Sequence, residues 1–246
     1  NKSLYLNLNN AENPNGNIFF GDGTNLTTPT SSVFTVGNNA QVNGSGKDYI
    51  AYAFHSVSGY SKIGTYDGDG TTNGSHAINL GFRPAFVMIK CINDVENWWI
   101  WDNVRNQVRP NATNNRTAAD TSNTETTNVS TGADYIEFTA TGFKHLGGGG
   151  GANGAGNSQK YVYLAFAGGL DSIAPVNTDG EYHSRTKVNS TYKQGMVTYH
   201  ATDGGGSVGH GLGETPEVVL IKRRSSTGHW VMPVSYTHLR AHETEA

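Results

Sequence analysis

The chain has little cysteine, little charge and no long apolar run, and each shortage excludes a class of protein. Cys91 is the single cysteine, so no disulfide can close within the chain. The longest apolar run, AFVMI at 85–89, is far shorter than the about 20 residues that span a bilayer, so we expect no membrane insertion. A net charge of -3 gives no basic field for phosphates, so we expect no nucleic acid partner.

Glycine is abundant, with 32 of 246 residues against a usual share of about 7%. Together with many Asn, Ser and Thr residues, it indicates a chain with many turns and few long helices. Short β-branched or alternating segments lie between these turns, and no 3.6-residue apolar period is sustained. The sequence therefore predicts an all-β fold of β-sandwich or jelly-roll-like modules in tandem, with few helices.

The chain repeats itself. Residues 74–98 align with residues 206–230 at a constant offset of 132, and nine positions agree without a gap. The identical pairs are Gly74/Gly206, Ser75/Ser207, Leu80/Leu212, Gly81/Gly213, Pro84/Pro216, Val87/Val219, Ile89/Ile221, Lys90/Lys222 and Trp98/Trp230. A second match, YIAYAF at 49–54 with YVYLAF at 161–166, has an offset of 112, and TY-glycine stretches at 63–70 and 196–205 open two of the units. Such self-similarity predicts repeated structural units.

The order of these matches divides the chain into units. We expect the C-terminal half of a module at 1–57, a complete β-sandwich at 58–169, a linker at 170–191 and the N-terminal half of a further module at 192–233. The chain thus looks truncated at both ends. The core of the complete unit is expected to include Phe86, Met88, Trp98, Tyr161 and Phe166. The two half-modules are expected to complete each other within the chain, with YIAYAF packing on EVVLIK at 217–222.

The C-terminal string VSYTHLRAHET, Val234–Thr244, resembles one reading-frame translation of an adapter used to prepare sequencing libraries. Residues 234–246 are therefore interpreted as a non-native tail on a metagenomic fragment. His238 and His242 would share one face of a helix beside Glu243, which is zinc-site spacing. A polar chain end without a core-forming pattern favours fraying instead, so we expect no metal site.

Two stretches offer candidate surface contacts for a ligand. In NWWIWD, Trp99 and Trp101 either form a sugar-stacking face or divide into a core and a rim aromatic. The stretch GGGGGANGAG at 147–156 either is a flexible hairpin tip or approaches a glycan closely, through Gly147, Gly150 and Asn153. It lacks the GK[ST] ending and the following helix of a phosphate-binding loop.

Other motifs give weaker signals. DGDG at 67–70 predicts a tight turn or a weak calcium site, and Ile78 stands where an EF-hand needs glutamate. Lys90 and Lys222 end apolar strands, either with the ammonium group reaching solvent or as ligand-binding lysines. No Ser-His-Asp, paired-carboxylate or multi-histidine pattern occupies matched positions, so we expect no enzyme activity and no cofactor.

Residues 30–70, with GFRPAFVMIK and NWWIWDNVRN that follow, resemble the tandem repeat domain of virion-associated proteins of marine tailed phages. The likeness covers nearly all of residues 2–233. In that family the modules occur beside concanavalin A-like lectin domains and in fibre-like proteins, with no known catalytic or binding residues. The resemblance implies an extracellular phage particle, the virion, as the location.

These observations favour a non-enzymatic virion structural protein, a tail fibre or other host-contacting appendage with a display or attachment role. Repeated modules suit multivalent binding, which multiplies weak contacts by about 10²–10⁴. The expected partners are a host-surface glycan or other virion proteins, and a homo-oligomer is a further expected assembly. The alternatives are a cellular carbohydrate-binding or adhesive surface protein and, third, a glycan depolymerase.

Overall fold

The structure is a computed structural model that describes residues 2–21, 25, 27–105, 112–113, 115–126, 135–155, 158–168, 176–201 and 205–232. Its elements, in chain order, are η1 (Gly16–Ile18), α1 (Ala40–Asn43), β1 (Ser61–Asp67), β2 (Ala77–Asn79), β3 (Pro84–Cys91), β4 (Trp99–Asp102), β5 (Ala112–Thr113), β6 (Thr117–Ala118), β7 (Ile136–Thr139), β8 (Gly142–His145), β9 (Lys160–Ala167), β10 (Val176–Asn177), β11 (Ser184–Asn189) and β12 (Gln194–Tyr199). No helix within these ranges is long and apolar enough to cross a membrane.

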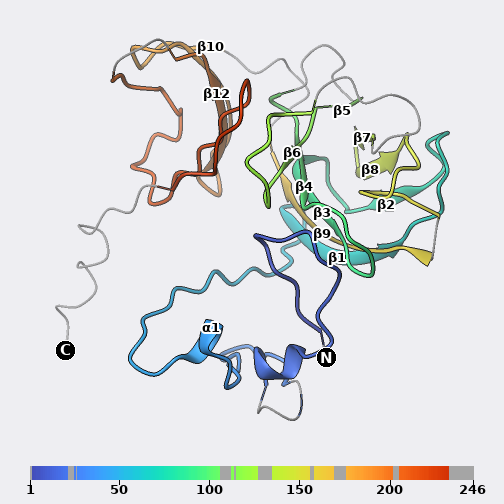
Figure 1. Cartoon of the computed structure of the whole chain (residues 1–246). Coiled ribbons are helices and arrows are strands. Elements are labelled where there is room, and N and C mark those ends of the chain that lie inside the picture. Colours follow the sequence, from blue (N-terminus) through green and yellow to red (C-terminus); the bar gives the residue numbers. More distant parts are fainter. Residues whose placement is uncertain are drawn as a thin grey trace.

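Three antiparallel sheets contain the strands of the described ranges (Figure 1). The first sheet has the order β1-β9-β3-β4-β6, and the second has the order β2-β8-β7-β5. Their strands lie between Ser61 and Ala167, inside the range 58–169 that the repeats mark as one unit. The third sheet, β10-β11-β12, lies in the following part of the chain. The all-β prediction is confirmed.

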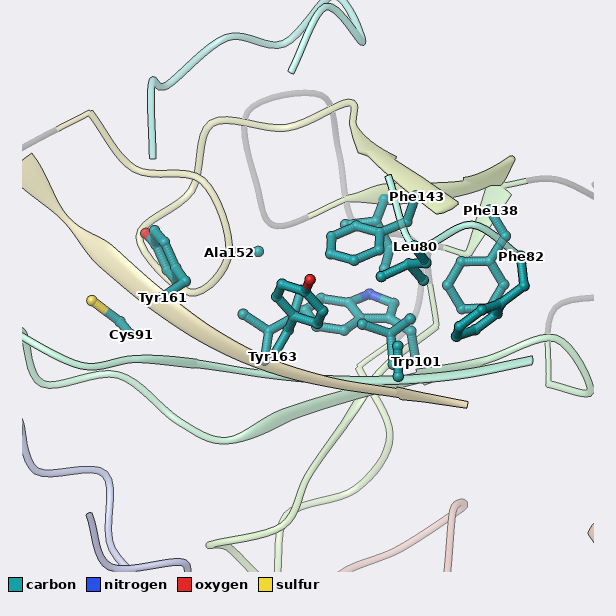
Figure 2. Packing of buried hydrophobic residues seen from close by; sticks show 13 residues of the cluster. Leu80, Phe82, Cys91, Trp101, Phe138, Phe143, Ala152, Tyr161 and Tyr163 are labelled. Carbon is teal, nitrogen blue, oxygen red and sulfur yellow. The ribbon is translucent and has the colours of Figure 1, made fainter. Parts of the chain in front are cut away.

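The first two sheets pack as a sandwich around one apolar cluster (Figure 2). From the first sheet it takes Val87, Ile89, Cys91, Trp101, Tyr161, Tyr163 and Ala165; from the second, Ile136, Phe138 and Phe143; and from the connecting loops, Leu80, Phe82 and Ala152. Alternate residues of β3 and β9 point into this cluster, as the two-residue period of a strand requires.

The prediction of the core was right for Tyr161 and wrong for the face of its neighbours. Tyr161 is fully buried, whereas Phe86, Met88 and Phe166 lie on the opposite, partly covered face of the first sheet. Because AFVMIK is apolar at every position before the lysine, its pattern does not indicate which alternate set faces the second sheet. Trp98 is likewise half-buried, and its indole Nε1 donates to the carbonyl of Tyr5 at 2.8 Å.

The N-terminal segment contacts the middle unit near the end of β3. The amide of Glu12 donates to the carbonyl of Ile92 at 2.7 Å, and the amide of Glu96 donates to the carbonyl of Asn9 at 3.0 Å. Further along the chain, the ring of Phe54 packs edge-on against Phe166 at 6.0 Å. Segments outside the repeat unit therefore cover part of the outer face of the first sheet.

The range assigned to a linker requires a correction. Residues 170–191 contain β10 and β11, and β11 pairs with β12 from Ser184 opposite Tyr199 to Asn189 opposite Gln194. The unit boundary therefore cuts through a sheet. The sequence did not indicate strand β11, SRTKVN, because five of its six residues are polar or charged and only Val188 is apolar.

The two half-modules do not form the predicted permuted sandwich in this conformation. Residues 49–54 lie in no strand, and EVVLIK at 217–222 contributes an isolated bridge rather than a strand. The side chains of Tyr52 and Met232 touch, with the tyrosine hydroxyl 3.7 Å from the sulfur. Backbone pairing between YIAYAF and EVVLIK is absent from the described residues, so the predicted strand pairing does not form within the single chain.

The third unit nevertheless repeats the hairpin of the middle unit. Ile221 and Val231 exchange two backbone hydrogen bonds of 2.8 Å. At the offset of 132, these positions correspond to Ile89 and Trp99, which are partners in the pairing of β3 with β4. The same residues therefore meet in both units, which supports the alignment found in the sequence.

Candidate functional site

The tryptophan pair that was a candidate ligand surface is enclosed. Trp101 is fully buried in the core cluster, so it cannot contact a ligand at the surface. Trp99 is half-buried against the same cluster, and the guanidinium carbon of Arg116 lies 3.7 Å from the centre of its ring. That cation–π contact occupies the ring face that a sugar would need. The sugar-stacking hypothesis is wrong for Trp101, and at Trp99 the Arg116 guanidinium covers the ring face on which a sugar would stack.

The glycine-rich stretch is docked on the sandwich rather than projecting from it. Gly147 is buried and Gly150 half-buried, so residues 147–154 do not form the predicted free hairpin tip. A Cβ on Gly148 would lie 2.4 Å from the carbonyl oxygen of Gly70, and a Cβ on Gly68 would lie 2.3 Å from that of Gly154. Glycine allows the backbones of the DGDG and glycine-rich loops to approach this closely. Residues 156–157 lie outside the described residues.

Asn153 connects the two loops. It is fully buried, and its amide nitrogen donates to the carboxylate of Asp69 at 3.1 Å and to the carbonyl of Thr71 at 3.0 Å. Its amide oxygen accepts from the backbone nitrogen of Asp69 at 3.1 Å and lies 2.6 Å from Nδ1 of His76. Because that oxygen only accepts, the His76 Nδ1 must carry the proton. We call residues 67–76 and 147–155 together the Asn153 junction.

Two tyrosine hydroxyls form hydrogen bonds with the backbone of the glycine-rich loop. The hydroxyl of Tyr66 donates to the carbonyl of Ala152 at 2.6 Å. The hydroxyl of Tyr161 donates to the carbonyl of Gly150 at 2.7 Å and accepts from the amide of Gly154 at 2.9 Å. The two rings stack with centroids 5.0 Å apart, so β1 and β9 present them side by side to the loop.

Asp69 and His76 form the solvent-facing side of the Asn153 junction. The Asp69 carboxylate is 44% exposed and lies 3.5 Å from Nδ1 of His76, whose side chain is 17% exposed. Burial raises the pKa of Asp69, but hydrogen bonds from the amide and hydroxyl of Thr71 and from Asn153, with the charge of His76, outweigh it and hold the pKa at about 2. The ionised carboxylate can accept hydrogen bonds from hydroxyl or amide groups of a partner.

His145 lies behind this pair, fully buried among aromatic rings. Its ring is 5.1 Å from that of Tyr66, 5.0 Å from that of His76 and 5.6 Å from that of Phe143. Neither ring nitrogen has a hydrogen-bond partner among the described residues. Burial, with the nearby His76, lowers the pKa of His145 to about 3, partly opposed by the charge of Asp69. The imidazole is therefore neutral in the folded protein at ordinary pH.

The lysine at the end of β3 does not reach solvent. Lys90 is fully buried, and its ammonium group donates to the backbone carbonyls of Cys91 and Asp94. Burial lowers the pKa of Lys90, against the attraction of Cys91, Asp120 and nearby carboxylates. The prediction of a snorkelling lysine is wrong here, because this end of β3 is covered by the loop that follows it. Lys222 of the third unit donates to the carbonyl of Thr121 instead.

The acidic groups of DGDG do not converge on one point. Asp67 lies in β1 and pairs with Lys160 across the sheet, whereas Asp69 accepts from Thr71 in an Asx turn. No group of three or more His, Cys, Asp or Glu side chains that could hold a metal ion occurs in the described part of the chain. His238, His242 and Glu243 lie outside the described residues. Within the Asn153 junction, Asp69 and His76 are the side chains that could hydrogen-bond to a ligand.

The first unit contains the same loop contact, which the sequence signalled only faintly. There the hydroxyl of Tyr49 donates to the carbonyl of Ala40 at 2.6 Å and accepts from the amide of Gly44 at 2.7 Å. Tyr49 is the counterpart of Tyr161 at the offset of 112, and both units carry an Asn-Gly pair before the strand. That shared Asn-Gly, preceding a shared Tyr, was the sequence signal that could have identified Asn153 as a structural residue.

Comparison with known proteins identifies the family of the chain. A family model matches residues 1–169 and 171–245, so the chain belongs to the family described as a domain of unknown function, DUF7483. The second match runs across residues 234–244 and lends no support to their interpretation as adapter sequence. Curated proteins and solved structures contain no match to the chain.

Proposed function

We propose that this chain is part of a non-enzymatic structural protein of a phage virion, a tail fibre or similar appendage that displays repeated β modules for attachment to a host. The observation that carries the proposal is the recurrence of one contact set in successive units. The Tyr161 and Tyr49 hydroxyls clamp equivalent loops, and the Ile89–Trp99 pair recurs as Ile221–Val231.

The conspicuous polar groups of the middle unit serve its folding. Asn153 uses all of its hydrogen-bonding groups to join two loops, and Lys90 is bonded to backbone carbonyls. Repeated modules of this kind act through number, because tethered copies gain avidity from weak individual contacts. The exposed Asp69 carboxylate beside His76 gives the middle unit a polar contact suited to a hydroxyl-rich glycan.

Immunogold labelling tests the location. Antibodies raised against the chain should label tail appendages in virus-sized particles from a sample that contains the gene. Labelling confined to bacterial cell surfaces would contradict the proposal and favour a cellular adhesive protein.

Binding and hydrolysis assays test the role. The chain, immobilised at high density on beads, should retain bacterial surface polysaccharide much better than the same amount of free chain. The polysaccharide should release no new reducing ends during the incubation. A time-dependent increase in reducing ends would indicate a glycan depolymerase and refute the non-enzymatic role.

A further inference from the structure

The middle unit supplies a pairing rule for the half-modules on either side of it. Strand β9 lies between β1 and β3 and pairs with both. Its Leu164 lies opposite Ile63 of β1 on one side and Met88 of β3 on the other. Strand β9 therefore completes the first sheet, and a unit that lacks its counterpart keeps a gap between two strands.

The counterpart of β9 in the first unit is available for pairing. YIAYAF at 49–54 aligns with YVYLAF of β9 at the offset of 112. Its residues lie in no described strand and expose large side chains: Ile50 is 68% exposed, Tyr52 55% and Phe54 60%. The segment carries no charge, which suits the interior of a sheet.

The third unit contains counterparts of β1 and β3, and no strand of the described residues pairs with both of them. Strand β12 aligns with β1 through the shared Thr-Tyr, Thr198 and Tyr199, and stands at the edge of the third sheet in the described structure. EVVLIK at 217–222 aligns with β3, bridges Val231 on one side only, and leaves Leu220 61% exposed. An uncovered edge beside an exposed apolar segment is a site for the addition of a strand.

We infer that residues 49–54 of one copy of this chain insert between β12 and residues 217–222 of a second copy, in the place that β9 takes in the middle unit. The register of β9 then sets Ala53 opposite Gly195 and Val219. It likewise sets Tyr52 opposite Met196 and Leu220.

Side-chain chemistry supports this register. Of the alternate residues, the two small ones, Ala51 and Ala53, fall on the face that is the core in the middle unit, beside Ile221 and Val219. The large ones fall on the other face, where their counterparts Leu164 and Phe166 pack against β3. The insertion thus buries apolar side chains on both faces and leaves no ion unpaired in the strand.

Contacts with the middle unit favour a second copy over the same chain as the partner. The hairpin of the third unit is held beside β6, where Arg224 pairs with Glu125 and the Trp230 indole donates to the carbonyl of Ala118. Phe54 contacts Phe166 of β9, and both β3 and β4 lie between β9 and β6 in the sheet. Two copies related by a twofold axis fill both gaps reciprocally and keep the hairpin beside β6, while strand pairing replaces the contacts that Tyr52 and Phe54 make in the single chain.

Cysteine crosslinking tests the register and the partner. Chains carrying Ala53→Cys and chains carrying Val219→Cys are mixed, oxidised and resolved by intact mass. Directly opposed residues of antiparallel strands have Cα atoms about 4.5–5.5 Å apart, within disulfide range. The mixed disulfide should form on the order of 10²-fold faster than with Leu220→Cys, because the register places the side chain of residue 219 beside that of residue 53 and turns the side chain of residue 220 to the other face.

The remaining outcomes decide against the inference. Equal rates with Val219→Cys and Leu220→Cys mean that this register does not form. A chain carrying both Ala53→Cys and Val219→Cys that closes its disulfide as a monomer identifies the same chain as the partner.

Sedimentation equilibrium gives a second measurement that needs no cysteine. The unmodified chain should reach twice the chain mass at micromolar concentration, and Ala51→Pro, in the middle of the inserted strand, should return it to the monomer. Ser45→Pro is the matched control, because position 45 follows Gly44 in the turn closed by the Lys47 amide, where proline is accommodated. A monomeric unmodified chain, or an Ala51→Pro dimer, would overturn the inference.

Discussion

Acid should destabilise the folded chain through His145, and the size of the effect follows from its burial. The pKa of His145 falls from 6.5 to about 3 on folding, chiefly because the ring is removed from water. Between these values the unfolded chain binds a proton that the folded chain does not, so stability falls as the pH falls. From pH 7 to pH 4.5 the loss is about 2.5 kcal/mol, since each pH unit below 6.5 contributes about 1.4 kcal/mol.

The perturbation that isolates this effect is His145→Phe, which keeps an aromatic ring among Tyr66, Phe143 and His76 but carries no proton. Urea unfolding, followed by tryptophan fluorescence at pH 7 and pH 4.5, gives the free energy of unfolding of both chains. The parent should lose about 2.5 kcal/mol more than the variant. His145→Gln should behave like the phenylalanine variant, because it is also neutral at both pH values.

The pH window separates His145 from the nearest acid. Asp69, with its pKa at about 2, contributes stability that is lost as the pH falls from about 4 through 2, below the range of the experiment. An equal loss of stability in the parent and both variants between pH 7 and pH 4.5 would refute the assignment of the effect to His145.

Three further predictions concern stability. Asn153→Ala should lower the free energy of urea unfolding by about 2–4 kcal/mol because it leaves buried groups of two loops unpaired. The control Asn123→Ala, at an exposed position, should lower it by about 0.5 kcal/mol or less. Equal losses for the two variants would contradict the role of the Asn153 junction. Trp101→Ala should cost about 3–5 kcal/mol and Trp98→Ala roughly 1–3 kcal/mol, and the reverse order would place the core on the other face. A chain that ends at Met232 should melt at the temperature of the full chain in calorimetry, with or without zinc, and a zinc-dependent rise would contradict this.

The sequence predicted the fold class and the two long central strands because their signals are local. AFVMIK and YVYLAF are short, rich in apolar residues and bounded by glycine or polar residues, and they became β3 and β9. The face of β3 that packs into the core could not be predicted from the local sequence. It depends on where the second sheet packs, and Val87 and Phe86 are both suitable for burial.

The prediction that the glycine-rich stretch forms a free surface loop was wrong for a related reason. A run of glycines is equally compatible with a free loop and with a loop pressed against another backbone, because both use the absence of a side chain. Gly148 and Gly68 are of the second kind, and only their neighbours in space reveal it. Asn153 is polar and follows five glycines and an alanine, so its local pattern indicates a surface rather than its complete burial.

The tyrosine–loop contact also identifies where the module can change length. The residue whose carbonyl accepts from the tyrosine precedes that tyrosine by 9 residues in the first unit and by 11 in the middle unit. Both tyrosine hydroxyls nevertheless make the same two hydrogen bonds. The additional residues lie between Gly154 and Tyr161, where the corresponding interval in the first unit is shorter by two. Because the closure entropy of a longer loop rises only slowly with length, this interval is a natural place to insert a peptide epitope or a fluorescent label without disturbing either sheet.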